Sequence, residues 1–430
     1  WGMASEWRTE RFGCMARLVR DTVHPTEATG LSYVGLEHIG EGSLSLIGTG
    51  RAEDATSTKT RFRKGDILFG KLRPYFRKVI RAPFDGICST DIWVIRPRAG
   101  IDAGFLFYLM ASDPFLEPVV RASEGTKMPR AKWDYAESLV LLLPPLPEQR
   151  AIARILGTLD DKIEANRRMN ETLEAIARAL FKSWFVDFDP VRAKAEGREP
   201  AGMDAETAAL FPDSFEETEL GEVPKGWELK SLDEIADFLN GLAMQKFPPE
   251  SEDFLPVIKI AELHRGNTIG SDRASSNIDS RYIIKDGDLL FSWSGSLEVC
   301  IWCGGKGALN QHLFKVSSTE YPMWFLYFWL KELLPEFQLI AAGKATTMGH
   351  IQRSHLSEAK AATPIAPLIE RVNVIIEPLF KSIIKNNLES RSLSSIRDAL
   401  LPRLLLGEIR VRGTEKSLED LPSKEKLATC

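Results

Sequence analysis

The sequence predicts an α/β (α+β) fold in which two similar mixed α/β units alternate with two long helices. Apolar residues recur in steps of four and three over 152–184, which is the seam of a coiled coil. The same pattern returns over 372–404, 220 residues later. Landmarks outside the helices, such as Trp7 and Trp227, keep this spacing. A repeat of one unit and one helix therefore organises the chain, and we expect a pseudo-twofold axis between the copies.

The composition is that of a globular protein. The chain has 430 residues, enough for two to three domains, with 44% hydrophobic and 27% charged residues. Because no run of eighteen apolar residues occurs, we expect no membrane segment. The first residues lack an apolar signal region, and the five scattered cysteines suit a reducing compartment. These features predict a cytoplasmic protein.

The repeat and the charge pattern divide the chain into six predicted segments. They are a first mixed unit at 1–147, a helix at 148–186, an acidic linker at 187–222, a second mixed unit at 223–367, a second helix at 368–406 and a polar, frayed tail at 407–430. Within the two units we expect buried helices at 103–120 and 321–337. Because Pro378 interrupts the second long helix, we expect a kink or a fresh start there, and an early end at Pro402.

The two long helices are predicted to pair with each other in antiparallel orientation. Eight of the ten seam positions keep their character in the second copy. Asn166 and Asn386 are polar in both copies, and a buried Asn on such a seam costs stability and fixes the register. The position of Ala177 departs most, because its counterpart is Arg397. The other interpretation is that two amphipathic helices simply fill a core.

The net charge of −5 hides an uneven distribution. Segment 187–222 has eleven acidic against three basic residues, a local charge of −8. Segment 51–81 has ten basic against three acidic residues, a local charge of +7. Clustered Lys and Arg residues supply phosphate contacts, and Arg can also read guanine, so the basic segment predicts contact with DNA.

The candidate DNA-binding residues lie at matching places in the two copies. In the first copy they are Lys59, Arg61, Arg63, Lys71, Arg73, Arg77, Lys127, Arg130 and Lys132. In the second copy they are Lys259, Arg265, Arg273, Lys306, Lys344, Thr346, Thr347, His350 and Arg353. The run GKLRPYFRK of the first copy corresponds to SWSGSLEVC in the second. Diverged surfaces on one scaffold are expected of two readers of different DNA sequences.

Four runs resemble the specificity subunits of type I restriction–modification enzymes. They are PPLPEQRAIARIL at 144–156, FKSWFVDFDP at 181–190, GDILFGKLRPY at 65–75 and GEVPKGWELKSLDEIA at 221–236. The resemblance covers nearly the whole chain. The second copy departs from the resemblance at 364–380, where the PLPEQ motif is missing. Partner proteins are therefore expected to dock with different strengths at the two ends.

The resemblance implies that each mixed unit is a target-recognition domain for one half of a bipartite, asymmetric site in double-stranded DNA. The long helices would separate the domains and dock two modification subunits, which methylate adenine. Restriction or motor subunits would join them, and the chain itself would be non-catalytic and would hold no cofactor. The outward positions expected to bind partners are Ile155, Ile176, Phe181 and Phe185.

Two other classes of protein are the alternatives to this interpretation. A coiled-coil scaffold with protein-binding ends would show no salt-dependent DNA binding. A self-sufficient methyltransferase is disfavoured, because no Gly-rich cofactor loop precedes the run SDPF at 112–115. Cys300 and Cys303 form a CxxC pair, but the second pair that a structural metal site requires is missing.

Overall fold

A computed structural model describes residues 7–123, 127–218, 221–250, 252–343 and 349–411. The chain forms two compact units. Unit 1 comprises 1–162 and 393–430, and unit 2 comprises 163–392. Each long helix therefore contributes residues to both units. Among the described residues, no helix is long and apolar enough to cross a membrane.

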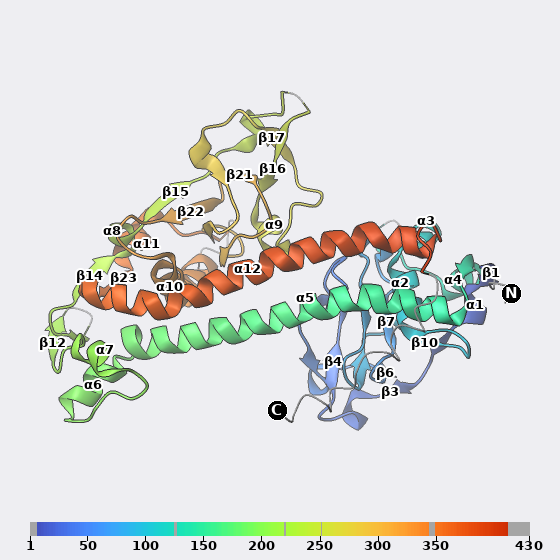
Figure 1. Ribbon diagram of the computed structural model, residues 1–430, viewed down its shortest axis with the longest axis horizontal. Coiled ribbons are helices and arrows are strands. Elements are labelled where there is room, and N and C mark those ends of the chain that lie inside the picture. The colour runs from blue at the N-terminus through green and yellow to red at the C-terminus, as the bar shows by residue number, and fades with distance from the viewer. Residues whose placement is uncertain (1–6, 124–126, 219–220, 251, 344–348, 412–430) are drawn as a thin grey trace, which may run out of the picture. The chain divides into compact units, whose positions relative to one another are not determined.

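Unit 1 is built on a four-stranded antiparallel sheet in the order β2-β10-β7-β8. Figure 1 labels its two central strands, β10 and β7. These strands are Ala16–Val19, Ile92–Pro97, Ile67–Gly70 and Val79–Arg81. Every residue of β7 is buried, which explains its unbroken apolar sequence. The strand is entered through a tight turn, where Gly65 has a φ of +89° that favours glycine.

A second sheet of unit 1 has the order β3-β6-β9-β4-β5 and includes a parallel pair, β4 with β9. Its strands are Thr22–Val23, Lys59–Phe62, Gly86–Cys88, Ser32–Val34 and Gly50–Arg51. A separate antiparallel pair joins β1 and β11, at Arg8–Arg11 and Val140–Leu143. Short 3-10 turns occupy Pro25–Glu27, Leu36–His38, Ala52–Asp54 and Pro74–Phe76.

The helices of unit 1 cover the first sheet and form its main core. They are α1, Phe12–Met15; α2, Ala103–Ala111; α3, Asp113–Arg121; and α4, Trp133–Ser138. The prediction of one helix over 103–120 was wrong. Ser112 adopts an extended conformation that ends α2, and a new helix, α3, begins at the Asp113-Pro114 pair. Phe115 is fully buried there and packs against Phe12.

Unit 2 repeats this architecture. Its sheets are β15-β22-β19-β20 and β17-β16-β21-β18, again with a parallel pair, β16 with β21. The strands are β14, Glu228–Ser231; β15, Asp237–Asn240; β16, Phe254–Ile258; β17, Arg273–Ser275; β18, Ile283–Ile284; β19, Leu289–Ser292; β20, Val299–Ile301; β21, Gly307–Leu309; β22, Leu313–Ser317; and β23, Lys360–Thr363. The helices are α8, Leu232–Ile235; α9, Ile260–Arg265; α10, Met323–Ala342; and α11, Arg353–Glu358. Short 3-10 turns lie at Met244–Lys246 and Ser280–Tyr282. The predicted internal repeat is confirmed by this shared strand order.

Segment 187–222 has more structure than a plain linker. It contains α6 at Asp189–Ala195, α7 at Ala205–Ala209, β12 at Phe215–Thr218 and the start of β13, Gly221–Pro224. Asp204 caps α7 through the backbone N–H of Thr207. That hydrogen bond, together with the neighbouring Arg371, lowers the pKa of Asp204 to about 2. Arg371 ties the segment to the second long helix within unit 2.

The two long helices are α5, Leu146–Phe181, and α12, Ala366–Leu405. A π-helical turn at Lys182–Val186 follows α5. The prediction of a fresh start at Pro378 was wrong, because α12 continues through it without a break, and Pro402 does not end the helix either.

Within unit 2 the two helices pair through polar side chains on the predicted seam. Asn386 donates from Nδ2 to Oδ1 of Asn170 at 2.9 Å, and Asn170 donates to Oδ1 of Asn387 at 2.7 Å. Asn166 is 3% exposed and donates to Oγ of Ser390 at 3.2 Å. Because 166 faces 390 while 170 faces 386, this pairing is antiparallel, as predicted (Figure 1).

Within unit 1 the same helices meet through an ion pair. Asp160 on α5 accepts hydrogen bonds from Arg397 on α12 and from the Tyr108 hydroxyl, which is 2.6 Å away. Burial, reinforced by Asp160, raises the pKa of Tyr108. The equivalent positions in unit 2 are apolar: Ala177 replaces the arginine, and Phe380 replaces the aspartate.

The beginning of the predicted tail is anchored in unit 1. Arg410 donates to both carboxylate oxygens of Glu148, at 2.9 and 3.0 Å, and the indole of Trp7 donates to the same group at 2.8 Å. The backbone of Val411 adds a further hydrogen bond. The expectation of a frayed tail is therefore wrong for Arg410 and Val411, because Glu148 binds both residues.

Candidate nucleic-acid interface

In unit 1, the turn between β7 and β8 is joined to the loop that precedes α4. Leu72 and Arg130 form an isolated antiparallel bridge. The backbone of Arg73 donates to Pro129 O at 2.8 Å, and that of Ala131 donates to Lys71 O at 2.8 Å. These hydrogen bonds bring together the two basic clusters, 71–77 and 127–132, that lie far apart in the sequence.

Unit 2 contains the same backbone arrangement. Ser294 and His350 form the corresponding bridge. The backbone of Gly295 donates to Gly349 O at 2.8 Å, and that of Ile351 donates to Trp293 O at 3.0 Å. We call this joined turn and loop the recognition frame, comprising 71–77 with 127–132 in unit 1 and 293–298 with 349–353 in unit 2.

The recognition frame of unit 1 carries arginines held by neighbours. Arg73 has a φ of +50° and donates from Nη2 to Lys127 O at 3.4 Å. Arg77, with a φ of +53°, forms an ion pair with Asp113 at 2.5 Å. Arg130 donates from Nε to Oδ1 of Asp91 at 3.1 Å. These contacts orient the guanidinium groups before any ligand binds.

The remaining candidates of unit 1 are not equivalent. The expectation for Lys59 was wrong, because its side chain is buried and its ammonium donates to Ser57 at 2.8 Å. Arg61 is half-buried on β6 and donates to Glu27 O at 3.4 Å. The other side chains lie at the surface, exposed at Arg63, Lys127 and Lys132 and half-buried at Lys71.

The recognition frame of unit 2 carries aromatic and imidazole groups, with Arg353 as its basic residue. Ser294 Oγ and His312 Nδ1 are 2.9 Å apart. The Trp293 indole donates to Oδ1 of Asn240 at 3.0 Å, and its ring lies 5.9 Å from that of His312 and 6.4 Å from that of His350. The two frames therefore present different hydrogen-bonding groups from the same backbone.

The other candidates of unit 2 are mostly engaged by acids or rings. Lys259 pairs with Asp272, Arg265 pairs with the buried Glu262, and Arg273 lies over the Phe254 ring at 4.2 Å. Arg353 donates to Phe238 O at 3.0 Å. Lys306 is exposed. Lys344, Thr346 and Thr347 lie outside the described residues.

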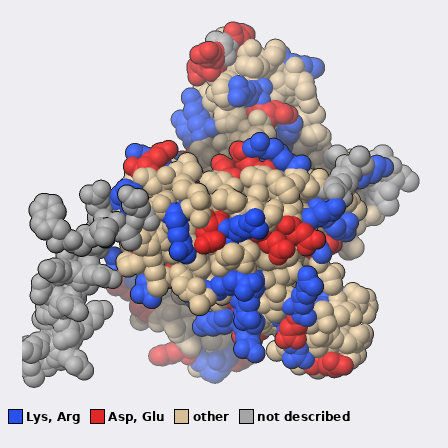
Figure 2. Space-filling view, turned by 90° about the vertical axis from the view of Figure 1, so that its right-hand side faces the viewer, with Lys and Arg blue, Asp and Glu red and all other residues tan. Residues whose placement is uncertain are grey.

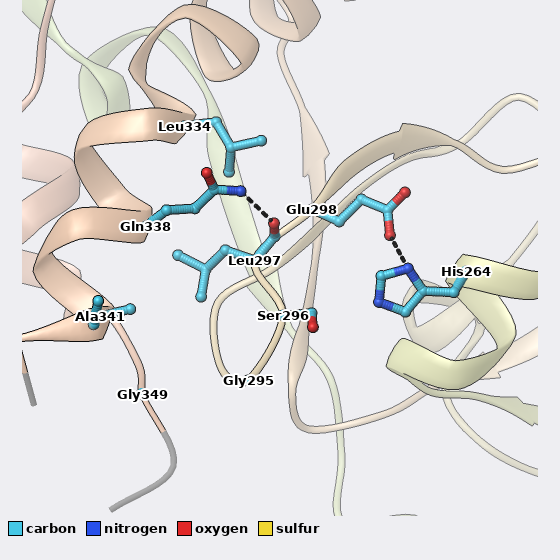
Figure 3. Close-up of a pocket in the computed structure, with 10 residues that line it drawn as sticks. His264, Gly295, Ser296, Leu297, Glu298, Leu334, Gln338, Ala341 and Gly349 are labelled. Carbon is cyan, nitrogen blue, oxygen red and sulfur yellow. Dashed lines mark hydrogen bonds and ion pairs between the residues drawn. The ribbon is translucent and has the colours of Figure 1, made fainter. Parts of the chain in front are cut away.

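A pocket of about 610 Å³ opens beside the recognition frame of unit 2 (Figure 3). On one side, His264 Nδ1 and Glu298 Oε2 are 2.9 Å apart. On the other, the side-chain amide of Gln338 donates to Leu297 O at 3.2 Å. The wall therefore combines apolar side chains with the contact between His264 of α9 and Glu298 of the recognition frame.

Basic and acidic groups are interspersed on the molecular surface. Figure 2 shows groups of Lys and Arg beside groups of Asp and Glu on one face, without one uninterrupted basic surface. The ion pairs of Arg77 and Arg130 show the same local mixing. The sequence pattern marked the basic residues but gave no signal for Asp91, His312 or Trp293, because contacts distant in sequence bring these residues together.

Two of the four predicted partner-binding residues are core residues. Phe181 and Phe185 are 1% and 0% exposed, and both pack against Phe325 of α10. The expectation of an outward face there was wrong, because α10 covers this end of α5. Ile176 is 47% exposed, and Ile155 is half-buried.

The two cysteines of the CxxC pair lie in unit 2 near β20. Burial raises the pKa values of the Cys300 and Cys303 thiols. Among the described residues, no group of three His, Cys, Asp or Glu side chains is arranged to hold a metal ion. In the run SDPF, Phe115 is a core residue and Asp113 pairs with Arg77.

The fold and the paired frames define a protein with two homologous recognition modules on one chain. The family model described as type I restriction modification DNA specificity domain matches residues 32–175 and 224–396. The chain therefore belongs to the specificity-subunit family of type I restriction–modification systems. Members of this family provide DNA recognition and are non-catalytic components.

Individual relatives agree with this assignment. The chain is 31% identical to the specificity subunit of the type I restriction enzyme HindI from Haemophilus influenzae, over 82% of this chain and 88% of the relative. It is 29% identical to the MjaIX specificity subunit of Methanocaldococcus jannaschii, over 81% and 79% of the two chains. The fold resembles the crystal structure of a type I S subunit from M. genitalium, with a TM-score of 0.50 and 15% identity over 94% of this chain and 97% of that one.

Proposed function

We propose that this chain recognises a bipartite, asymmetric site in double-stranded DNA and reads one half-site with each unit. The observation that carries the proposal is the recognition frame, which recurs with matched backbone hydrogen bonds and different side chains. A shared frame keeps the mode of docking, and different side chains change the base edges that it accepts. The two half-sites would therefore differ in sequence.

We further propose that two modification subunits dock on the long helices and methylate adenine, and that restriction subunits join this complex in the cytoplasm. Ile176 and Ile396 occupy equivalent positions in the repeat and are 47% and 48% exposed. Ile155 and Ile375 form a second equivalent pair, half-buried and 37% exposed. Two matching sets of apolar residues that are at least partly exposed on a duplicated scaffold suit two copies of one partner.

The long helices would also set the gap between the half-sites. Their seam combines apolar residues with Asn170 and Asn386, which specify one register. A pairing with a single register has a fixed length. The number of unread base pairs should therefore follow the length of the helices.

The division of labour can be tested by mapping methylated adenines with the full chain and its modification subunits. Lys71→Ala with Lys127→Ala should relax the base preference in one half-site. Ser294→Ala with His350→Ala should relax the base preference in the other. Relaxation of both half-sites by either pair would contradict the proposal. DNA binding should also weaken steeply with salt, whereas a protein-binding scaffold would show no such loss.

Docking can be tested by copurification with the modification subunit. Ile176→Ser with Ile396→Ser should reduce the amount recovered and leave far-UV helicity near normal, because both side chains are exposed. Thr172→Ser with Ser392→Thr, at exposed polar positions of α5 and α12, provides the matched control. Unchanged copurification of the Ile variant would exclude these residues from the docking surface.

A further inference from the structure

We infer that Arg130, oriented by Asp91, reads a guanine in the half-site of unit 1. The inference rests on the proposed function and names one of its base contacts. Arg130 belongs to the recognition frame, where its backbone is fixed by the bridge to Leu72. Its side chain is 49% exposed, so the guanidinium lies at the surface.

The contact with Asp91 leaves the reading edge of Arg130 available. Asp91 accepts from Nε at 3.1 Å, and within the described part of the chain the two terminal nitrogens have no hydrogen-bond partner. Those nitrogens form a planar fork that matches the O6 and N7 acceptors of guanine in the major groove. An arginine restrained through Nε loses less conformational freedom when it binds such an edge.

Asp91 is itself held against the recognition frame. Its backbone carbonyl accepts from Lys71 N at 2.9 Å, and its backbone N–H donates to Oγ of Ser89 at 3.2 Å. The carboxylate also argues against a phosphate contact. A negative group beside the guanidinium offsets its charge and repels a phosphate, whereas a guanine edge is neutral and rich in acceptors.

Unit 2 provides an internal comparison. His312 occupies the place of Asp91, because its carbonyl accepts from Trp293 N at 3.3 Å, and His350 occupies the place of Arg130. Neither imidazole offers a planar pair of donors like that of a guanidinium. The guanine contact is therefore assigned to unit 1, with no counterpart at the equivalent position of the second half-site.

The test uses the full chain with its modification subunits and a methylation map. Arg130→Ala and Arg130→Lys should both relax the same guanine of one half-site, with roughly 10- to 100-fold less discrimination at that base pair. Lysine keeps the charge but lacks the fork. Asp91→Ala should weaken the preference at the same base pair. Arg8→Ala, which removes an exposed arginine paired with Glu10, should leave the site unchanged.

A binding measurement adds an independent readout. Replacing that guanine by 7-deazaguanine removes the N7 acceptor and should weaken binding of the unsubstituted protein by roughly tenfold, but not binding of Arg130→Ala. Full guanine preference in Arg130→Lys, or loss of methylation without base relaxation, would overturn the inference in favour of a charge or phosphate contact. Relaxation of a different base by Asp91→Ala would refute its orienting role. Absence of any recurrent methylated site with the unsubstituted chain would instead refute the proposed function.

Discussion

Arg397 on α12 donates from Nη1 to Oδ1 of Asp160 on α5 across 2.7 Å, and only 4% of the Arg397 side chain is exposed. Burial alone would lower the pKa of Arg397, but Asp160 and Asp398 raise it. The repeat places Ala177 and Phe380 at the equivalent positions, so the position that carries an ion pair in unit 1 is apolar in unit 2.

Removing the arginine should therefore cost more than removing a surface charge. Arg397→Ala leaves Asp160 partly buried without its cation and should reduce the free energy of unfolding by about 3 kcal/mol. Arg403→Ala, which breaks the exposed pair with Glu408, should cost at most about 1 kcal/mol. Adding Asp160→Phe to Arg397→Ala reproduces the residues of unit 2 and should recover part of the loss. Denaturant unfolding measures all three, and equal losses in the two single variants would contradict the role of the buried pair.

Replacing both asparagines of the seam should change the stability of the protein in the opposite direction to replacing one of them. Asn386→Leu alone leaves the Asn170 carbonyl oxygen without its donor and should destabilise the protein by about 1–2 kcal/mol. Asn170→Leu with Asn386→Leu should be neutral or stabilising but should lose a single register. Thermal unfolding gives the stability, and hydrogen exchange of α5 and α12 reports the register. A double variant with native exchange protection would show that these residues do not specify pairing.

The contact that anchors Arg410 and Val411 to Glu148 should weaken in acid. Burial alone would raise the pKa of Glu148, but hydrogen bonds from Arg410 and Trp7 lower it. A lowered pKa stabilises the fold above the unfolded value, about 4.3, and this stabilisation is lost as pH falls through the folded value. The unsubstituted protein should therefore exceed Glu148→Gln in unfolding free energy at pH 6, and the difference should shrink below about pH 4. Glu117→Gln, at an exposed ion pair, should follow the unsubstituted protein throughout. A difference that does not change with pH would exclude this carboxylate as its source.

Lengthening the helices should change the gap in the DNA target. Because Asn170 contacts Ile383 and Asn386, heptads inserted after Asn170 and after Ile384 lie opposite each other and keep the seam in phase. Seven residues add roughly 10 Å, close to three base pairs at about 3.4 Å each. The added base pairs also rotate one half-site about the DNA axis, so methylation at the original gap should fall sharply. A heptad in α5 alone is the control for seam disruption. Full activity at the original gap would show that the helices do not act as a spacer.

The sequence predicted most of the architecture because the repeated residues have strict requirements for local backbone conformation. Gly65 and Gly287 both adopt positive φ, and the seam positions are set by helical periodicity. The errors arose where tertiary packing decides. Outward heptad positions predicted exposure at Phe181, but α10 covers that end of the helix. Asp91 gave no signal, because only the bridge between Leu72 and Arg130 brings it beside an arginine distant in sequence.

The division of unit 1 between the two ends of the chain governs how the protein can be made. Leu401, Leu404 and Leu405 of α12 belong to the same core as Ile152. During translation the first 162 residues therefore leave the ribosome before the α12 residues of their core have been synthesised. Residues 163–392 emerge as one contiguous stretch. Unit 2 can complete its core during translation, and unit 1 must wait for the last turns of α12. A nascent chain truncated before residue 393 contains all of unit 2 but lacks the α12 residues that complete the core of unit 1. Premature termination therefore leaves apolar core residues of unit 1 exposed.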